Sequence, residues 1–339
     1  LALVRRSEYH KIRYQYYLHD LIGCALLFSR FLLVPAAVVD GIGGRSACDS
    51  HHLIACGPVF LAVLPALCCL WSLSILELSP RTIAVLEESS MISVTDNDAV
   101  RSLLLDRPEA LNAFNNEMFD GLTDALLTAA DDDSVKVVII SGAGRAFSAG
   151  LDLASNGDDR LKHGFPGLFE AFLEFPKPIL LAINGLGVGF GCTVCGLVDL
   201  VFMAESARLR CPFSALGLTA EAASTVTFPA LIGHQAATWA LMSSEWLDAD
   251  TCQRMGLAFR VVADDELLQV TQRHAEILAA QPLASLMTTK ELLMAPRRDA
   301  LREADEIEGA AMASLRGGAA NLEAIAAFKQ KRLADFTEL

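Results

Sequence analysis

Positive charge is scarce in this sequence of 339 residues. Its 27 lysine and arginine residues are outnumbered by 41 aspartate and glutamate residues, which gives a net charge of −14 at pH 7. Nucleic-acid binding needs a clustered basic surface, so we expect no nucleic-acid partner. Residues 1–90 hold seven basic and seven acidic side chains, which cancel. All of the net negative charge therefore belongs to residues 91–339, a composition typical of a soluble acidic enzyme.

Cysteine lacks the pattern of a disulfide framework, because the nine residues are odd in number and irregularly spaced. A reducing, cytoplasmic compartment is therefore expected. The cluster of Cys48, His51, His52 and Cys56 matches the spacing of no zinc module. Cys192-Thr193-Val194-Cys195 has neither a second pair nor a nearby histidine, so we expect thiols that pack a helix start and no metal site.

Residues 1–90 lack the organisation of the rest of the chain. Residues 53–76 are apolar and uncharged, long enough to cross a bilayer, and the basic, aromatic residues 1–17 resemble a cytoplasmic flank. Pro58 and Pro65 interrupt that apolar run, however, and Met91 opens a segment that looks like a natural amino terminus. We expect residues 1–90 to be a non-native leader from an over-extended reading frame. A membrane anchor and a folded partner domain are the alternatives, and membrane contact is expected only if this segment is native.

Residues 91–339 alternate apolar runs and helical spacing, which predicts a parallel sheet covered by helices, an α/β fold. We divide them into a core at residues 91–280 and a C-terminal helical region at residues 281–339. Apolar runs predict strands at residues 100–106, 135–141, 179–183 and 198–203. Helices are predicted at residues 115–130, from the glycine-rich turn to about 197, and at residues 225–241, 264–280 and 321–339.

Two turns that follow predicted strands can present backbone N–H groups. Residues 184–191 contain four glycines, which allow close approach to a ligand, and lead into a helix whose amino end favours negative charge. Residues 147–152 form the other turn, in which Gly150 frees the N–H of Leu151, and Asp152 can cap a following helix. Two such donors can hold one oxyanion. A purely structural turn is the alternative for the first, whereas a dinucleotide site is disfavoured because Asp199 comes too early for its acidic residue.

These turns belong to motifs through which residues 91–339 resemble the crotonase superfamily, the enoyl-CoA hydratase/isomerase family. Residues 1–90 have no counterpart. The resemblance implies a crotonase-type spiral of ββα turns ending in helices that mediate trimer formation, and a CoA thioester substrate with no metal or redox cofactor. The motifs are Arg107-Pro108-Glu109-Ala110-Leu111-Asn112-Ala113, Ala146-Phe147-Ser148-Ala149-Gly150-Leu151-Asp152-Leu153, Asn184-Gly185 with its following glycines, Cys211-Pro212-Phe213, Gly256-Leu257 and Phe328-Lys329-Gln330-Lys331-Arg332.

The resemblance also assigns site residues. It implies that the N–H groups of Leu151 and Phe190 bind the thioester oxygen. Phe328 and Lys331 match positions that contact CoA from a neighbouring subunit of a homotrimer or dimer of trimers; a solvated basic helix end is the alternative. The remaining substrate-binding or CoA-binding positions are Ala149, Gly150, Asp152 and Gly189.

Glu221 is the candidate acid/base. Hydratases of the family use two glutamates, but the matching positions here are Thr193 and Phe213, which cannot accept a proton as a carboxylate does. Glu221 follows Pro212-Phe213-Ser214-Ala215-Leu216-Gly217 by four residues, a pattern similar to peroxisomal-type Δ3,Δ2-enoyl-CoA isomerases, in which one glutamate is the base. We expect the nearby Phe213, Leu216 and Leu218 to raise its pKa.

The sequence therefore predicts isomerisation of 3-enoyl-CoA to 2-enoyl-CoA in fatty-acid oxidation. An enoyl-CoA hydratase or other crotonase chemistry is the alternative within this family. A catalytically silent acyl-CoA-binding protein is a further alternative, in which Glu221 is a surface or helix-start residue. The loop at residues 154–167 is expected to line the acyl pocket.

Overall fold

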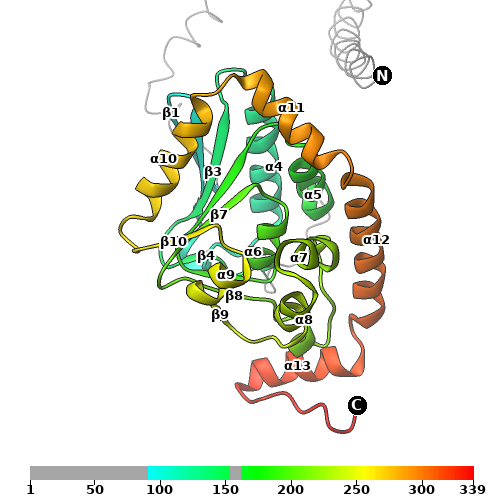
Figure 1. Ribbon diagram of the computed structural model, residues 1–339. Coiled ribbons are helices and arrows are strands. Elements are labelled where there is room, and N and C mark those ends of the chain that lie inside the picture. The colour runs from blue at the N-terminus through cyan, green and yellow to red at the C-terminus, as the bar shows by residue number, and fades with distance from the viewer. Residues whose placement is uncertain (1–90, 153–161) are drawn as a thin grey trace, which may run out of the picture. The chain divides into compact units, whose positions relative to one another are not determined.

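The computed structural model describes residues 91–152 and 162–339 (Figure 1). Predictions about residues 1–90, including the leader, the membrane alternative and the Cys48 cluster, fall outside the described residues, as does most of the loop at residues 154–167. Within the two described ranges, no helix is both long enough and apolar enough to cross a membrane.

The larger sheet has six strands in the order β1-β2-β3-β5-β7-β10. All neighbours are parallel except β1, which pairs antiparallel with β2 and which the sequence did not predict as a strand. Every residue of β3 and β5 is buried, as an apolar run in a covered parallel sheet requires. The strands are β1 (Ile92–Asn97), β2 (Val100–Leu105), β3 (Val137–Gly142), β5 (Ile179–Ile183), β7 (Leu200–Ala204) and β10 (Arg260–Val262).

A second sheet of four short strands, in the order β4-β6-β8-β9, lies beyond the carboxyl ends of the first. It comprises β4 (Ala146–Ser148), β6 (Leu186–Val188), β8 (Arg208–Arg210) and β9 (Leu247–Asp248). Along the chain a long strand, a short strand and a helix recur: β3, β4 and α5, then β5, β6 and α6, then β7, β8 and α7. This recurrence is the spiral of ββα turns that the sequence predicted.

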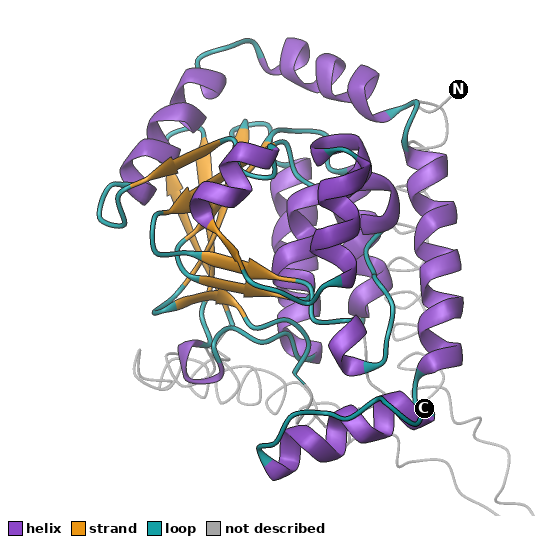
Figure 2. Cartoon of the chain, turned by 60° about the horizontal axis from the view of Figure 1, so that its bottom comes forward, coloured by secondary structure: helices purple, strands orange, loops and turns teal. Residues whose placement is uncertain are grey.

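Helices cover the sheets and continue past them. The first, α4, begins where the Asn115 side chain accepts a hydrogen bond from Met118 N at 2.9 Å, and it packs against α5. Figures 1 and 2 show α11, α12 and α13 passing in turn around one side of the core. The helices are α4 (Asn116–Asp131), α5 (Gly164–Glu174), α6 (Phe190–Thr193), α7 (Ser224–Ile232), α8 (His234–Met242), α9 (Ala249–Met255), α10 (Leu267–Ala279), α11 (Leu283–Met294), α12 (Arg298–Leu315) and α13 (Ala319–Gln330).

Two predicted helices are wrong in extent. The helix predicted at residues 225–241 is two helices, because Gly233 adopts φ +77° and ends α7. The helix predicted at residues 321–339 ends at Gln330, where Lys331 turns left-handed. The segment that follows folds back, since Asp335 N donates to a Glu323 carboxylate oxygen at 2.9 Å.

Charged side chains anchor helices near the amino ends of the parallel strands. Lys177 is fully buried and donates to Ala129 O at 2.7 Å and Asp132 O at 2.6 Å, both at the end of α4. Lys290 of α11 donates to Lys177 O at 2.7 Å and forms an ion pair with Asp199 at 2.8 Å. Burial lowers the pKa of both lysines.

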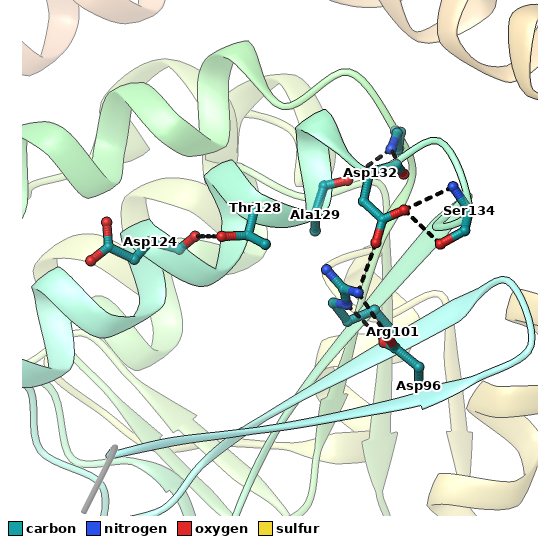
Figure 3. Close-up of polar contacts among 8 residues, drawn as sticks. Asp96, Arg101, Asp124, Thr128, Ala129, Asp132 and Ser134 are labelled. Atoms are coloured by element: carbon teal, nitrogen blue, oxygen red, sulfur yellow. Dashed lines mark hydrogen bonds and ion pairs between the residues drawn. The ribbon is translucent and has the colours of Figure 1, made fainter. Parts of the chain in front are cut away.

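An ion-pair network at the same end of the sheet joins β1, β2 and the end of α4 (Figure 3). Arg101 lies between Asp96, at 2.7 Å, and Asp132, at 3.0 Å, and Asp132 also accepts from Ser134. This end of the sheet is therefore held by charges, and the opposite end, where the two glycine-containing turns lie, is left for the site.

Candidate active site

A cavity of about 630 Å³ opens beside the two glycine-containing turns. Apolar residues form most of its wall, and three acidic residues are among those that line it. Such a mostly apolar cavity with a few polar groups is typical of a small-molecule site. The lining residues are Asn116 and Phe119 of α4, Leu151, Phe165 and Pro166 of α5, Phe190, Glu221, the α12 residues Asp305, Glu308, Gly309, Met312 and Ala313, and Arg316.

The two turns pack directly on each other. Gly150 adopts φ +83°, and a β-carbon there would lie 2.6 Å from Val188 O, so only glycine fits. Gly189 adopts φ +55°, and a β-carbon there would lie 3.9 Å from Gly150 Cα and 3.8 Å from Glu221 Oε1. The Glu221 carboxylate therefore lies beside Gly189, where the two turns meet.

One backbone N–H group in each turn lies outside the hydrogen bonds of the sheets and helices. Phe114 N donates to Gly150 O at 2.7 Å, and Asp152 N donates to Phe114 O at 3.0 Å. These two hydrogen bonds use the residues on either side of Leu151 and leave the Leu151 N–H out of the pairing. Phe190 is the first residue of α6, so its N–H has no acceptor within the helix. Within residues 91–152 and 162–339, neither N–H donates to a protein acceptor. The arrangement suits two donors converging on an oxyanion.

Glu221 sits on a turn of unusual backbone. Ala222 and Ala223, which follow it, adopt φ +60° and +53°, and Ser224 Oγ donates to Glu221 O at 2.6 Å. Burial, and then the negative charges of Glu308 and Asp305, raise the pKa of Glu221 to about 7, partly opposed by Arg316. A carboxyl that titrates near neutrality suits proton transfer in both directions.

The raised pKa of Glu221 agrees with the sequence prediction, but the three apolar residues named for it form no part of the cavity wall. Phe213, Leu216 and Leu218 do not line the cavity. The apolar wall comes from distant segments, principally the rings of Phe119, Phe165 and Phe190, which contact one another edge to face or tilted.

Thr193 and Phe213, which the resemblance matched to the two hydratase glutamates, are buried outside the cavity. Nearby, Cys192 Sγ lies 3.4 Å from Cys211 Sγ. That contact, followed by burial, raises the thiol pKa of Cys192, and burial raises the thiol pKa of Cys195. No group of residues able to hold a metal ion occurs in the described part of the chain. The Cys192–Cys195 pair packs the helix start, as expected.

The other predicted positions do not line the cavity. Ala149 N donates to Leu111 O at 2.9 Å, and Asp152 forms an ion pair with Arg107 at 2.7 Å. Both contacts therefore hold the turn at residues 147–152 against the segment at residues 107–111. Phe328 and Lys331 lie on the exposed end of α13, where the Phe328 side chain is 75% exposed.

Two acidic residues of the cavity were missed. They are Asp305 and Glu308, and the Glu308 side chain is only 4% exposed. Burial, and then the negative charges of Glu308 and Glu306, raise the pKa of Asp305 to about 6. Their spacing of three places them on one face of α12, with Met312 one turn on. The sequence shows this spacing, but it does not show that this face of α12 lines the cavity.

Comparison with known proteins identifies proteins that are similar to this chain in sequence and in fold. The model of the family described as enoyl-CoA hydratase/isomerase matches residues 95–339. An Escherichia coli 1,2-epoxyphenylacetyl-CoA isomerase is 30% identical over 70% of this chain and 95% of its own length. Human enoyl-CoA delta isomerase 2 is 31% identical over 61% of this chain and 55% of its own. The crystal structure of an enoyl-CoA hydratase from Mycobacterium marinum is 49% identical, with a TM-score of 0.58 over 61% of this chain and all of its own.

Proposed function

This chain belongs to the enoyl-CoA hydratase/isomerase family, and we propose that it isomerises 3-enoyl-CoA thioesters to 2-enoyl-CoA thioesters in fatty-acid oxidation. One observation carries the proposal: a carboxylate with a pKa of about 7, that of Glu221, lies beside Gly189 at the junction of two turns whose N–H groups are free to bind an oxyanion. The absence of carboxylates at positions 193 and 213 supports isomerisation over hydration.

The chemistry needs one acid/base group and one oxyanion site. The thioester oxygen accepts hydrogen bonds from Leu151 N–H and Phe190 N–H, which stabilises the dienolate formed when Glu221 removes a C2 proton. Glu221 then returns that proton to C4, and the double bond moves from C3–C4 to C2–C3. One oxyanion donor contributes about 3 kcal/mol in other enzymes. Neither a metal nor a redox cofactor enters these steps, and coenzyme A is part of the substrate.

Hydration is the second candidate, and one observation favours it. Asp305 adds a second carboxylate to the cavity that holds Glu221, so a pair of acidic groups able to handle water is present on two different elements. In that case the enzyme would form 3-hydroxyacyl-CoA from 2-enoyl-CoA. The relative from Mycobacterium marinum, named as a hydratase, is in line with this alternative.

We also propose a homotrimer or a dimer of trimers. In it, Phe328 and Lys331 of one copy contact the CoA held by its neighbour, which accounts for their exposure away from the cavity of their own chain. Sedimentation of the purified protein tests the oligomer. Phe328→Ala is then expected to raise KM for the CoA substrate more than it lowers kcat.

A turnover assay on 3-enoyl-CoA and 2-enoyl-CoA across acyl-chain lengths tests the function. We expect isomerisation of the first, no 3-hydroxyacyl-CoA from the second, and a loss of 10²-fold or more in Glu221→Gln. Glu303→Gln removes an exposed carboxylate from α12 and serves as the control, with activity unchanged. Hydroxyacyl product, or near wild-type isomerisation by Glu221→Gln, would rule the proposal out. Acyl-CoA binding without exchange of C2 protons in deuterated water would instead indicate a silent binding protein.

A further inference from the structure

Glu308 holds the turn that carries Glu221. Its Oε2 accepts from Ala223 N–H at 2.7 Å, and its Oε1 accepts from Thr225 N–H at 2.9 Å and from Thr225 Oγ–H at 2.6 Å. The side chain is 4% exposed and belongs to α12, which packs against α7. One carboxylate therefore binds three donors within the four residues that follow Glu221.

The turn needs such support. Ala222 and Ala223 are both left-handed, a conformation that is unfavourable for residues with a β-carbon. Thr225 N–H lies in the first turn of α7, where backbone N–H groups lack intrahelical acceptors. A negative charge beside the amino end of a helix is favourable. Glu308 satisfies these groups from outside the turn, and Glu221 keeps its place beside Gly189.

We propose that Glu308 is a positioning residue for the proposed isomerase, which fixes the Glu221 carboxylate against the oxyanion turns through its hydrogen bonds to Ala223 and Thr225. Its negative charge has a second role, because it disfavours the ionised form of Glu221. The inference rests on the proposed function for its kinetic consequences but not for its geometry. Of the described residues, the charged groups that act on Glu221 are Glu308 and Asp305 of α12 and Arg316 just after it. Asp305 makes none of these hydrogen bonds to the turn. Of these three described residues, Glu308 is therefore the one that both binds the turn and acts on Glu221 through its charge.

Two variants separate charge from hydrogen bonding. Glu308→Gln keeps the volume but removes the charge and one acceptor oxygen, because an amide nitrogen cannot accept from an N–H donor. We expect kcat to fall about tenfold to a hundredfold, with KM changing less, and the rise of activity with pH to move to lower pH. Thr225→Val removes only the Oγ–H donor, so we expect a smaller fall in kcat and an unchanged pH profile. Glu303→Gln, on the exposed side of α12, leaves both unchanged.

The pKa of Glu221 is also measured without turnover, by carboxyl NMR titration of ¹³C-labelled protein, with Glu221→Gln identifying the signal. We expect a lower pKa in Glu308→Gln than in the wild type or in Glu303→Gln. If the wild type does not isomerise 3-enoyl-CoA, the proposed function fails, while the titration still decides the role of Glu308. If the wild type isomerises but Glu308→Gln changes neither kcat nor the pKa of Glu221, the positioning role is wrong and Glu308 serves only folding.

Discussion

Replacing Glu221 by glutamine is expected to stabilise the protein at alkaline pH while it removes activity. Burial and two neighbouring carboxylates hold the pKa of Glu221 at about 7, against 4.5 for an ordinary glutamate. A group whose pKa is raised on folding stabilises the protein below its unfolded pKa, and this contribution is lost as pH rises through the folded pKa. From these two pKa values, the raised pKa destabilises the folded protein by about 3 kcal/mol at pH 8 and by about 1 kcal/mol at pH 5, relative to a group that never ionises. At pH 5 the carboxyl is protonated in the folded protein, and the difference arises because it ionises in the unfolded chain.

Glutamine mimics the protonated carboxyl and avoids that cost. Glu221→Gln should therefore exceed the wild type in free energy of unfolding by up to about 3 kcal/mol at pH 8, and by about 1 kcal/mol at pH 5. Urea unfolding of both proteins at the two pH values measures this, and the titrating groups that do not interact with Glu221 cancel in the comparison. A stability difference that does not grow between pH 5 and pH 8 would refute the reasoning, because Glu221 would then ionise freely in the folded protein.

Three further results are expected. Because Glu221 acts as a base, kcat/KM for 3-enoyl-CoA should rise with pH through about 7, and a profile flat from pH 5 to 9 would contradict its role. Gly150→Ala places a β-carbon against Val188 O at φ +83°, so it should cost more than about 1 kcal/mol in thermal unfolding and lower kcat, whereas tolerance of alanine would show that the two turns separate easily. Lys290→Met leaves Asp199 unpaired and should cost about 3 kcal/mol, whereas Arg302→Met, on an exposed network, should cost less than about 1 kcal/mol; equal costs would contradict the ranking.

The sheet could be predicted where burial leaves a local pattern. β3 and β5 are buried at every residue, so their apolar runs are unmistakable in the sequence. The strands of the second sheet have two or three residues, too few to show a period. The break at Gly233 was missed because apolar spacing continues across it, and only the backbone angle of that glycine separates the two helices.

Some residues of the candidate site could be predicted from local sequence motifs, and others could not. The two glycine-containing turns and Glu221 lie in motifs of a few residues, so their part in the site could be predicted. Asp305 and Glu308 reach the cavity from α12, more than 80 residues after Glu221, and no local pattern indicates which surface that helix meets. For the same reason the sequence located the apolar neighbours of Glu221 next to it in the chain, whereas they come from α4, α5 and α6.

The contribution of α12 to the cavity also orders events during synthesis. Translation runs from the amino to the carboxyl end, so every strand, the last ending at Val262, leaves the ribosome before Arg298–Leu315 does. Until α12 docks, the rings of Phe119, Phe165 and Phe190 have no covering wall and the turn after Glu221 lacks the carboxylate that binds it. A nascent chain that ends before α12 therefore lacks the five α12 residues that line the cavity, among them the carboxylate that binds the turn after Glu221.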